Sequence, residues 1–115
     1  MQEQITICAL IYDESNRILL VNSNKWKGYG LPGGKPKEGE SEEITLHREI
    51  KEEVGIEITD LLKFEEIRLK PTKEIDNLTT FIVKPYIARA LITEIMPNKE
   101  ITGWKWFDPR ALRTN

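Results

Sequence analysis

The most informative stretch of the chain runs from Gly34 to Ile56 and has the sequence GKPKEGESEEITLHREIKEEVGI. It contains seven glutamates but only one arginine, Arg48. Carboxylates placed so closely repel one another unless a cation holds them together. The sequence alone leaves open whether that cation comes from the solvent, from a lysine or from a bound metal ion.

The same stretch predicts one helix, over about residues 42–54. Ser41 is suited to the N-cap position, and Glu42 and Glu43 follow it in the first turn, where the helix dipole favours negative charge. Gly55 is suited to the position just after the helix, because glycine readily adopts the left-handed conformation that ends many helices.

A helical wheel, drawn with ~100° per residue, divides this helix into two faces. Its acidic face carries Glu42, Glu49, Glu52 and Glu53. Its apolar arc carries Ile44, Leu46, His47, Ile50 and Val54. We therefore expect the histidine to be packed rather than to act as a ligand. A solvated surface is the usual interpretation of an acidic helix face, but Glu49 and Glu53 form a like-charge pair one turn apart. Three carboxylates within one turn suit a hard divalent cation such as Mg²⁺ or Mn²⁺.

The segment before the helix has the composition of a structured loop. Residues 23–36 include four glycines and two prolines. Gly33 and Gly34 let the backbone approach a ligand closely, and Lys35 adds a positive charge suited to phosphate. Glycine-rich loops are common in proteins, so this loop indicates a ligand site only because it directly precedes the acidic helix.

At every specified position, residues 34–56 resemble the Nudix box, G-x5-E-x7-R-E-U-x-E-E-x-G-U, in which U is an aliphatic residue. The matching positions are Gly34, Glu40, Arg48, Glu49, Ile50, Glu52, Glu53, Gly55 and Ile56. The flanking segments GLPGGK and WKWFDPRAL also look like Nudix surroundings, so the resemblance covers almost the whole chain. It implies an α+β fold, described as an α/β/α sandwich around a mixed β-sheet, with the box as a loop–helix–loop.

The resemblance also implies a reaction, the hydrolysis of a nucleoside diphosphate linked to another group by attack of water at phosphorus. It assigns the metal ligands as Glu49, Glu52, Glu53 and the Gly34 carbonyl. Arg48 is expected to orient a glutamate, and Glu40 to act as a supporting carboxylate near the attacking water. Two residues are candidates for the general base, Glu53 within the box and Glu100 in the loop before the last expected strand.

The rest of the chain predicts a sheet. Two apolar runs at 5–12 and 17–22, joined by a turn, predict a β-hairpin. Further strands are expected at 56–69, 78–91 and 102–107, followed by a short helical turn through Leu112. Pro85 inside one of these runs predicts an edge, a bulge or a break.

Length and composition are those of one globular domain, which we expect to span residues 1–115. The formal net charge of -2 predicts neither strong nucleic-acid binding nor attraction to an anionic membrane.

Cys8 is the only cysteine, which fits a reducing compartment, and its apolar surroundings predict a small core residue. The N-terminal residues have no basic region and no long apolar stretch, so a soluble cytoplasmic protein is expected. A monomer and a homodimer both remain compatible with the sequence.

The substrate is less clearly indicated than the reaction. Small size without an added domain resembles the MutT-type enzymes, which convert nucleoside triphosphates to monophosphates and pyrophosphate. Pro71 lies 71 − 56 = 15 positions after Ile56 and resembles a marker of ADP-ribose pyrophosphatases, the alternative substrate class. Candidates for stacking on a base are Trp26, Tyr29, Phe81 and Trp104, although simple packing is the alternative for each. After Leu112 only three residues remain, where Nudix members usually continue into a longer helix, and this leaves base selectivity open, with a minimal enzyme and a broad-specificity enzyme as the two alternatives.

Two other classes of function remain open from the sequence. One is a Nudix-fold module that binds a nucleotide without cleaving it, although such modules commonly lose a box glutamate and none is lost here. The other is a structural domain with an acidic helix and no ligand. The response of the melting temperature to Mg²⁺ or Mn²⁺ separates the last class from the others, since a specific metal site stabilises the fold by mass action.

Overall fold

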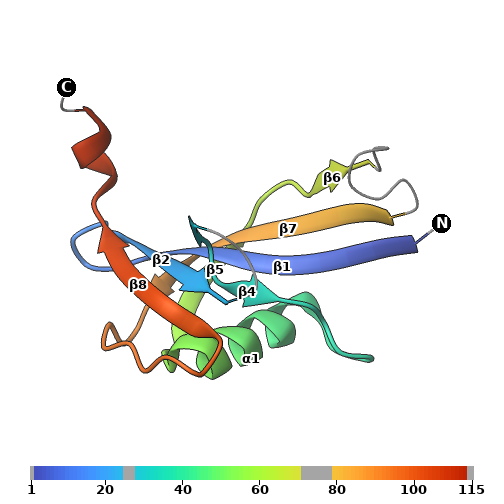
Figure 1. The fold of residues 1–115 in the computed structure, drawn as a ribbon, viewed down its shortest axis with the longest axis horizontal. Coiled ribbons are helices and arrows are strands. Elements are labelled where there is room, and N and C mark those ends of the chain that lie inside the picture. The colour runs from blue at the N-terminus through green and yellow to red at the C-terminus, as the bar shows by residue number, and fades with distance from the viewer. Residues whose placement is uncertain (1, 25–27, 71–78, 114–115) are drawn as a thin grey trace.

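A computed structural model describes residues 2–24, 28–70 and 79–113 (Figure 1). The predicted helix is α1 (Glu42–Val54). The strands are β1 (Gln2–Tyr12), β2 (Ile18–Ser23), β3 (Tyr29–Gly30), β4 (Gly33–Gly34), β5 (Ile58–Lys63), β6 (Ile67–Leu69), β7 (Thr79–Ala90) and β8 (Ile101–Phe107), and a 3₁₀ helix, η1 (Pro109–Arg113), follows them. Trp26 and Pro71, which the sequence singled out, lie outside the described residues.

The strands form one mixed sheet with the central order β3-β2-β1-β7-β5. Strands β1 and β7 are parallel along their whole length, from Gln2 opposite Thr79 to Tyr12 opposite Arg89. The other pairings are antiparallel: β4 with β1, β6 and β5 with β7, and β8 and β3 with β2. This arrangement confirms the predicted α+β fold with a mixed sheet. Of the two helical layers in the sandwich that the resemblance implies, the described residues form one, α1 (Figure 1).

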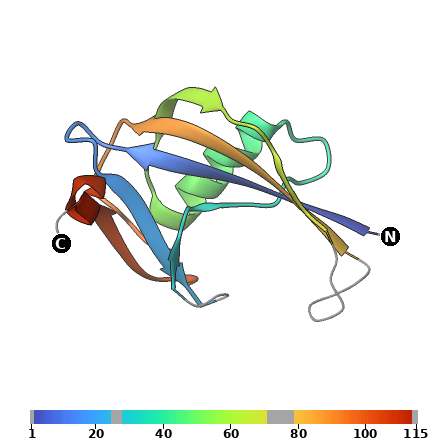
Figure 2. The same ribbon diagram turned by 90° about the horizontal axis from the view of Figure 1, so that it is seen from above.

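The predicted β-hairpin is present at its turn, but its two strands then part. The buried Asp13 carboxylate holds the turn by accepting hydrogen bonds from the backbone N–H groups of Ser15 and Arg17, at 2.9 and 2.8 Å. Strands β1 and β2 pair only at Tyr12 and Ile18. From there β2 runs beside β8 and β1 beside β7, and the two halves of the sheet diverge (Figure 2). Strand β4 pairs with β1 where β2 has left it.

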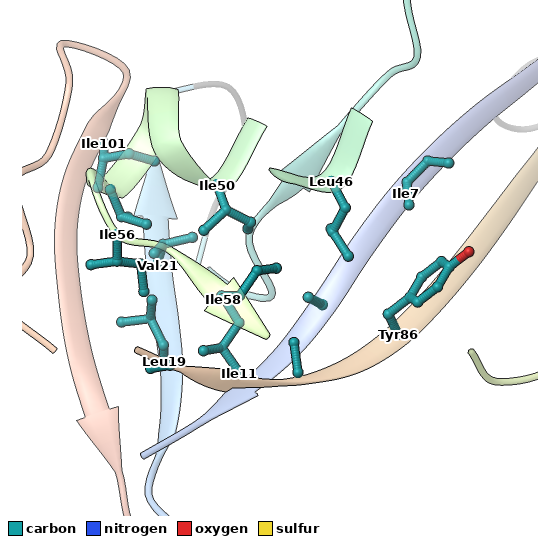
Figure 3. Packing of buried hydrophobic residues seen from close by; sticks show 14 residues of the cluster. Ile7, Ile11, Leu19, Val21, Leu46, Ile50, Ile56, Ile58, Tyr86 and Ile101 are labelled. Carbon is teal, nitrogen blue, oxygen red and sulfur yellow. The ribbon is translucent and has the colours of Figure 1, made fainter. Parts of the chain in front are cut away.

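The core lies between the sheet and α1 (Figure 3). Leu46, Ile50 and Val54 of the helix are fully buried against apolar residues of the strands, among them Ile7 and Ile11. The predicted apolar arc is wrong at one side, because Ile44 and His47 are exposed. The buried arc is instead shifted toward the acidic face and takes in Thr45 and Glu53. The helix therefore turns part of its acidic face into the protein.

Pro85 lies inside a continuous strand rather than at an edge. On one side β7 pairs with β5 up to Lys63 opposite Tyr86, and with β6 from Ile67 opposite Val83. The proline thus sits where the neighbouring strand is interrupted, and a missing backbone N–H is tolerated there. The break falls in the predicted strand at 56–69, which forms two strands instead of one.

Helices long and apolar enough to cross a membrane are absent from the described part of the chain.

Candidate active site

Local capping holds α1 at the predicted boundaries. The Ser41 side chain accepts a hydrogen bond from the backbone N–H of Ile44, at 3.2 Å. Gly55 adopts the left-handed conformation with φ 74°, and its N–H donates to the Lys51 carbonyl at 3.0 Å. Both helix ends therefore match the prediction. The helix carries Glu49 and Glu53 past the short strand β4.

The two glycines of β4 are required by the closeness of their neighbours. A Cβ atom on Gly33 would collide with the carbonyl oxygen of Ile7 on the adjacent strand. A Cβ atom on Gly34 would collide with the carboxylate of Glu49. Because glycine has no side chain, the strand passes between β1 and the helix carboxylates without a clash.

Glu53 is the most unusual carboxylate of the site. Its side chain is 6% exposed, and its Oε1 accepts a hydrogen bond from the backbone N–H of Gly33 at 3.2 Å. Burial raises the pKa of Glu53 to about 8, and the negative charges of Glu49 and Glu100 add to the rise. A buried carboxylate facing two other carboxylates is in an environment that favours neutralisation by a proton or by a bound cation.

Arg48 connects the remaining box glutamates. It binds Glu40 through two hydrogen bonds, Nε to Oε2 at 2.6 Å and Nη2 to Oε1 at 2.8 Å. Its Nη1 also donates to Glu49 at 2.8 Å and to Glu52 at 3.2 Å. The guanidinium beside Glu40, with the backbone N–H of Lys37, lowers the pKa of that carboxyl to about 2. The Arg48 guanidinium thus balances part of the negative charge of the acidic stretch. Its hydrogen bonds go to Glu40, Glu49 and Glu52 rather than to Glu53.

The helical wheel groups Glu42 with Glu49, Glu52 and Glu53, but in the structure Glu42 belongs to a separate cluster. Its carboxylate accepts hydrogen bonds from Lys84 Nζ at 2.9 Å and from Tyr86 Oη at 2.7 Å, and it pairs with Lys63 Nζ at 2.9 Å. Glu42 lies two turns before Glu49 along the helix, so it meets β7 and β5 rather than β4. It fastens the start of α1 to the sheet.

A cavity of ≈ 580 Å³ opens beside the helix carboxylates. It is lined by Thr6, Cys8, Ser23, Gly30, Leu31, Gly33, Gly34, Lys35, Glu49, Glu53 and Glu100. Six of these were predicted as site residues, and they come from three separate parts of the chain: the glycine loop, α1 and the loop before β8. The structure therefore brings Glu100 to the box, as one of the two proposed assignments of the base requires.

Other predicted residues do not line the cavity. Glu52 is half exposed and is held by Arg48. Tyr29 lies on β3 under Lys105, whose Nζ is 4.5 Å from the centre of the ring. Phe81 lies on β7 opposite Gln4, and Trp104 is exposed on β8. Among the predicted site residues that the structure describes, those that line the cavity are Gly33, Gly34, Lys35, Glu49, Glu53 and Glu100.

Thr6, Cys8 and Ser23 line the cavity but were not predicted as site residues. Cys8 was expected in the core, and this is wrong: it is half-buried on the opposite face of β1 from Ile7, which is buried beneath α1. The alternation Ile5, Ile7, Ala9, Ile11 is visible in the sequence and could have placed Thr6 and Cys8 on the other face.

The residues fit a divalent cation by their chemistry. Glu49, Glu53 and Glu100 line one cavity together with the half-buried Gly33 and Gly34, and carboxylate and backbone carbonyl oxygens are the donors that a hard cation prefers. Among the described residues, no three or more acidic, histidine or cysteine side chains are already gathered as a metal site. Arg48 instead engages one oxygen of Glu49 and both oxygens of Glu52. The oxygen donors are suitable for a hard cation, and Arg48 holds two of the carboxylates that were predicted as metal ligands.

The fold and the cavity define an α+β domain in which an acidic helix and a glycine strand share one pocket. The sequence matches the NUDIX domain over residues 2–115. The chain therefore belongs to the Nudix family and is a pyrophosphohydrolase of that family. Enzymes of this family generally use divalent metal ions.

Solved structures with the same fold agree with the family assignment. A MutT NUDIX hydrolase from Burkholderia pseudomallei is 26% identical, with a TM-score of 0.78 over 93% of this chain and 84% of that chain. The Escherichia coli dihydroneopterin triphosphate pyrophosphohydrolase has the same fold, with 20% identity and a TM-score of 0.77 over 96% of this chain and 86% of its own. So does the NUDIX domain of Shewanella oneidensis NrtR, solved with ADP ribose, at 18% identity and a TM-score of 0.78 over 98% and 77% of the two chains. No curated protein matches the sequence.

Proposed function

We propose that this chain hydrolyses nucleoside triphosphates to nucleoside monophosphates and pyrophosphate, by attack of water at phosphorus and with Mg²⁺ or Mn²⁺ as cofactor. The observation that carries the proposal is the placement of Glu53, buried beside Glu49 and Glu100 in one cavity with Lys35 and the glycine strand. The site thus offers carboxylates for a cation and a lysine for phosphate. The similarity to a MutT hydrolase and to a triphosphate pyrophosphohydrolase supports the choice of substrate.

The proposed roles follow from the chemistry of phosphoanhydrides, whose negative charge repels a nucleophile. A divalent ion, when bound, shields the phosphates and activates water for attack. Glu49, Glu52 and Glu53, with the Gly34 carbonyl, are proposed to hold the cation, which requires Glu52 to turn from Arg48. Arg48 and Glu40 keep Glu49 in position through their charge-assisted hydrogen bonds. Lys35 attracts the phosphates.

The proton of the attacking water goes to a carboxylate of the cavity. We assign this role to Glu53, because it is buried and held against Gly33 by a hydrogen bond. Glu100 lines the same cavity and is the alternative base. The variant Glu100→Gln separates the two assignments, because Glu100 is not among the proposed metal ligands: turnover near the wild-type rate would support Glu53 as the base, and a large loss would support Glu100.

Glu53→Gln is the first test. We expect hydrolysis of a triphosphate panel with Mn²⁺ to fall by at least about 100-fold, since general base catalysis contributes on that order. The fold should survive, because glutamine has nearly the same shape and no charge to bury. Glu57→Gln, an exposed change just after the acidic stretch, is the matched control and should hydrolyse at the wild-type rate. Unchanged turnover in Glu53→Gln would contradict the assignment of the site.

The same panel should include ADP-ribose, because a NUDIX domain of the same fold was solved with that compound. Rapid release of AMP and ribose 5-phosphate, with little hydrolysis of triphosphates, would move the proposal to the alternative substrate class. Tight binding of a nucleotide with no product over long incubation would instead indicate a non-catalytic sensing module.

A further inference from the structure

The loop between β7 and β8 is fixed on the end of α1 (Figure 1). The backbone N–H of Met96 donates a hydrogen bond to the Val54 carbonyl at 2.8 Å. The backbone N–H of Asn98 donates to the Glu53 carbonyl at 2.9 Å. Both carbonyls belong to the last turn of the helix, whose carbonyl groups have no partner within the helix itself. Gly55 permits this close approach, since a Cβ atom there would lie 2.8 Å from the Cβ of Met96. The loop thus takes its position from the helix end that carries Glu53.

Asn98 also shapes the turn that leads to Glu100. Its side-chain Oδ1 accepts a hydrogen bond from the backbone N–H of Glu100 at 3.0 Å, and its carbonyl accepts one from the N–H of Ile101 at 3.3 Å. An asparagine side chain that binds the backbone two residues further on stabilises a turn there. On the other side, the Glu100 carbonyl accepts a hydrogen bond from the N–H of Asn24, just after β2, at 2.9 Å. The backbone of Glu100 is therefore held from both sides.

Asn98 connects two carboxylates that are far apart in the sequence. Its backbone binds Glu53 and its side chain binds Glu100, and both of these glutamates line the cavity. The charge of Glu100 acts on Glu53, since it contributes to the raised pKa of that carboxyl. Divalent cations bind more tightly where more negative charge surrounds them and where that charge is held more rigidly. The position of Glu100 should therefore affect the affinity of this cavity for a cation.

We propose that Asn98 is a positioning residue, which fixes the Glu100 carboxylate beside Glu53 and thereby strengthens cation binding in the cavity. This rests on the proposed function only in taking Mg²⁺ or Mn²⁺ as the cofactor. Glu100 contributes negative charge near the cation and is not itself among the proposed ligands. Because Arg48 offsets part of the charge of Glu49, further negative charge in the cavity increases the attraction for a cation.

The test measures Mn²⁺ binding by calorimetry, without substrate. Asn98→Ala removes the hydrogen-bond acceptor, and Asn98→Gln keeps the amide group but moves it one methylene away from the turn. We expect each to weaken Mn²⁺ binding by about tenfold, as is usual when a group that orients a metal site is lost. Asn98→Ser should stay within about threefold of wild type, because a hydroxyl can accept the same hydrogen bond more weakly.

Glu100→Gln removes the charge itself and should also weaken Mn²⁺ binding by about tenfold. Glu94→Gln is the matched control, an exposed carboxylate in the same loop, and should stay within about twofold because solvent screens its charge. In the Glu100→Gln background, Asn98→Ala should cause no further loss beyond about twofold, since the two residues act as one unit. If Asn98 only supported the end of α1, the loss would be the same in both backgrounds, and this result would overturn the proposal.

Amide hydrogen exchange in the metal-free protein tests the contact directly. Asn98→Ala should speed exchange at the Glu100 N–H by at least about tenfold and leave exchange at the Met96 N–H unchanged. Faster exchange at both would mean that the loop has left the helix, and unchanged exchange at Glu100 would mean that the hydrogen bond is unimportant; either overturns the proposal. If melting curves show that Asn98→Ala does not fold, Asn98→Gln takes its place in both measurements.

The outcome is separable from that of the proposed reaction. Mn²⁺ binding that follows this series in a chain that hydrolyses no triphosphate would support the positioning role of Asn98 while refuting the proposed reaction. An active enzyme whose Mn²⁺ binding is the same in wild type, Asn98→Ala and Asn98→Gln would overturn the positioning role alone. So would unchanged Mn²⁺ binding in Glu100→Gln, and a wild-type protein that binds no Mn²⁺ would overturn both proposals.

Discussion

At the scale of single residues, Arg48 is the side chain that organises the acidic stretch. It contacts Glu40, Glu49 and Glu52 at once, and its Nη2 also donates to the Lys35 carbonyl at 3.1 Å. The carboxylates in turn hold the pKa of Arg48 above its usual value, Glu40 most strongly. Part of the positive charge that the clustered glutamates require is thus supplied by the Arg48 side chain. Its hydrogen bonds go to Glu40, Glu49 and Glu52, so Glu53 can be neutralised by a different group.

Arg48→Lys tests this role. Lysine keeps the positive charge but cannot form the two parallel hydrogen bonds to Glu40 while also reaching Glu49. We expect the Mn²⁺ concentration for half-maximal hydrolysis to rise by about 10- to 100-fold, the usual effect of losing a partner that positions a metal ligand. Arg68→Lys, in an exposed ion pair with Glu66, is the control. The same Mn²⁺ dependence in both variants would show that Arg48 supplies charge alone.

At the scale of elements, α1 is fastened at its start by Glu42. Hydrogen bonding from Lys84, supported by Lys63 and Tyr86, lowers the pKa of Glu42 to about 2. A lowered pKa in the folded state means that stability is present above the unfolded value of 4.5 and is lost as the pH falls toward about 2. The charge of this carboxylate therefore contributes to the attachment of the helix at neutral pH.

Glu42→Gln should accordingly flatten the acid side of the stability curve. We expect the free energy of unfolding of this variant to be lower by roughly 2 kcal/mol at pH 7, with a smaller further loss than wild type between about pH 4.5 and pH 2. Urea denaturation over this range measures both effects. Glu43→Gln, one residue along and exposed, should behave as wild type. Parallel curves for wild type and Glu42→Gln would contradict the account.

Strand β4 gives a second prediction at this scale. Alanine at either glycine causes a collision, but with different neighbours: rigid backbone at Gly33 and a mobile carboxylate at Gly34. Gly33→Ala should lower the melting temperature markedly, because the strand must move. Gly34→Ala should melt close to wild type yet lose at least about tenfold in hydrolysis, since Glu49 is displaced. Equal effects of the two variants on stability would be inconsistent with this geometry.

Features set by neighbouring residues could be predicted from the sequence, whereas features set by contacts between distant segments could not. The helix could be predicted to its terminal residues because Ser41 and Gly55 act locally. The burial of Glu53 could not, since it depends on which arc of the helix the sheet covers. The hairpin was predicted from its turn, but the separation of β1 and β2 results from pairings with β7 and β8, far away in the sequence. Glu100 was placed in the site by resemblance, and Cys8 was assigned to the wrong face because its alternation with Ile7 was not used.

At the scale of the whole molecule, the cavity forms where the two halves of the sheet diverge. Strand β1 contributes Thr6 and Cys8 to its lining, and Ser23 at the end of β2 lines it with Gly30 and Leu31. Helix α1 closes the acidic side. Because the chain carries a net charge of -2, the proposed attraction of a polyphosphate would depend on local groups such as Lys35 and on bound cations rather than on the overall charge.

The most direct test of the central claim is the hydrolysis of nucleoside triphosphates by the wild-type chain, with products identified by phosphorus NMR. The account predicts nucleoside monophosphate and pyrophosphate in equal amounts when Mg²⁺ or Mn²⁺ is present, and no turnover in excess chelator. Turnover at full rate in the chelator, or orthophosphate as the primary product, would contradict it.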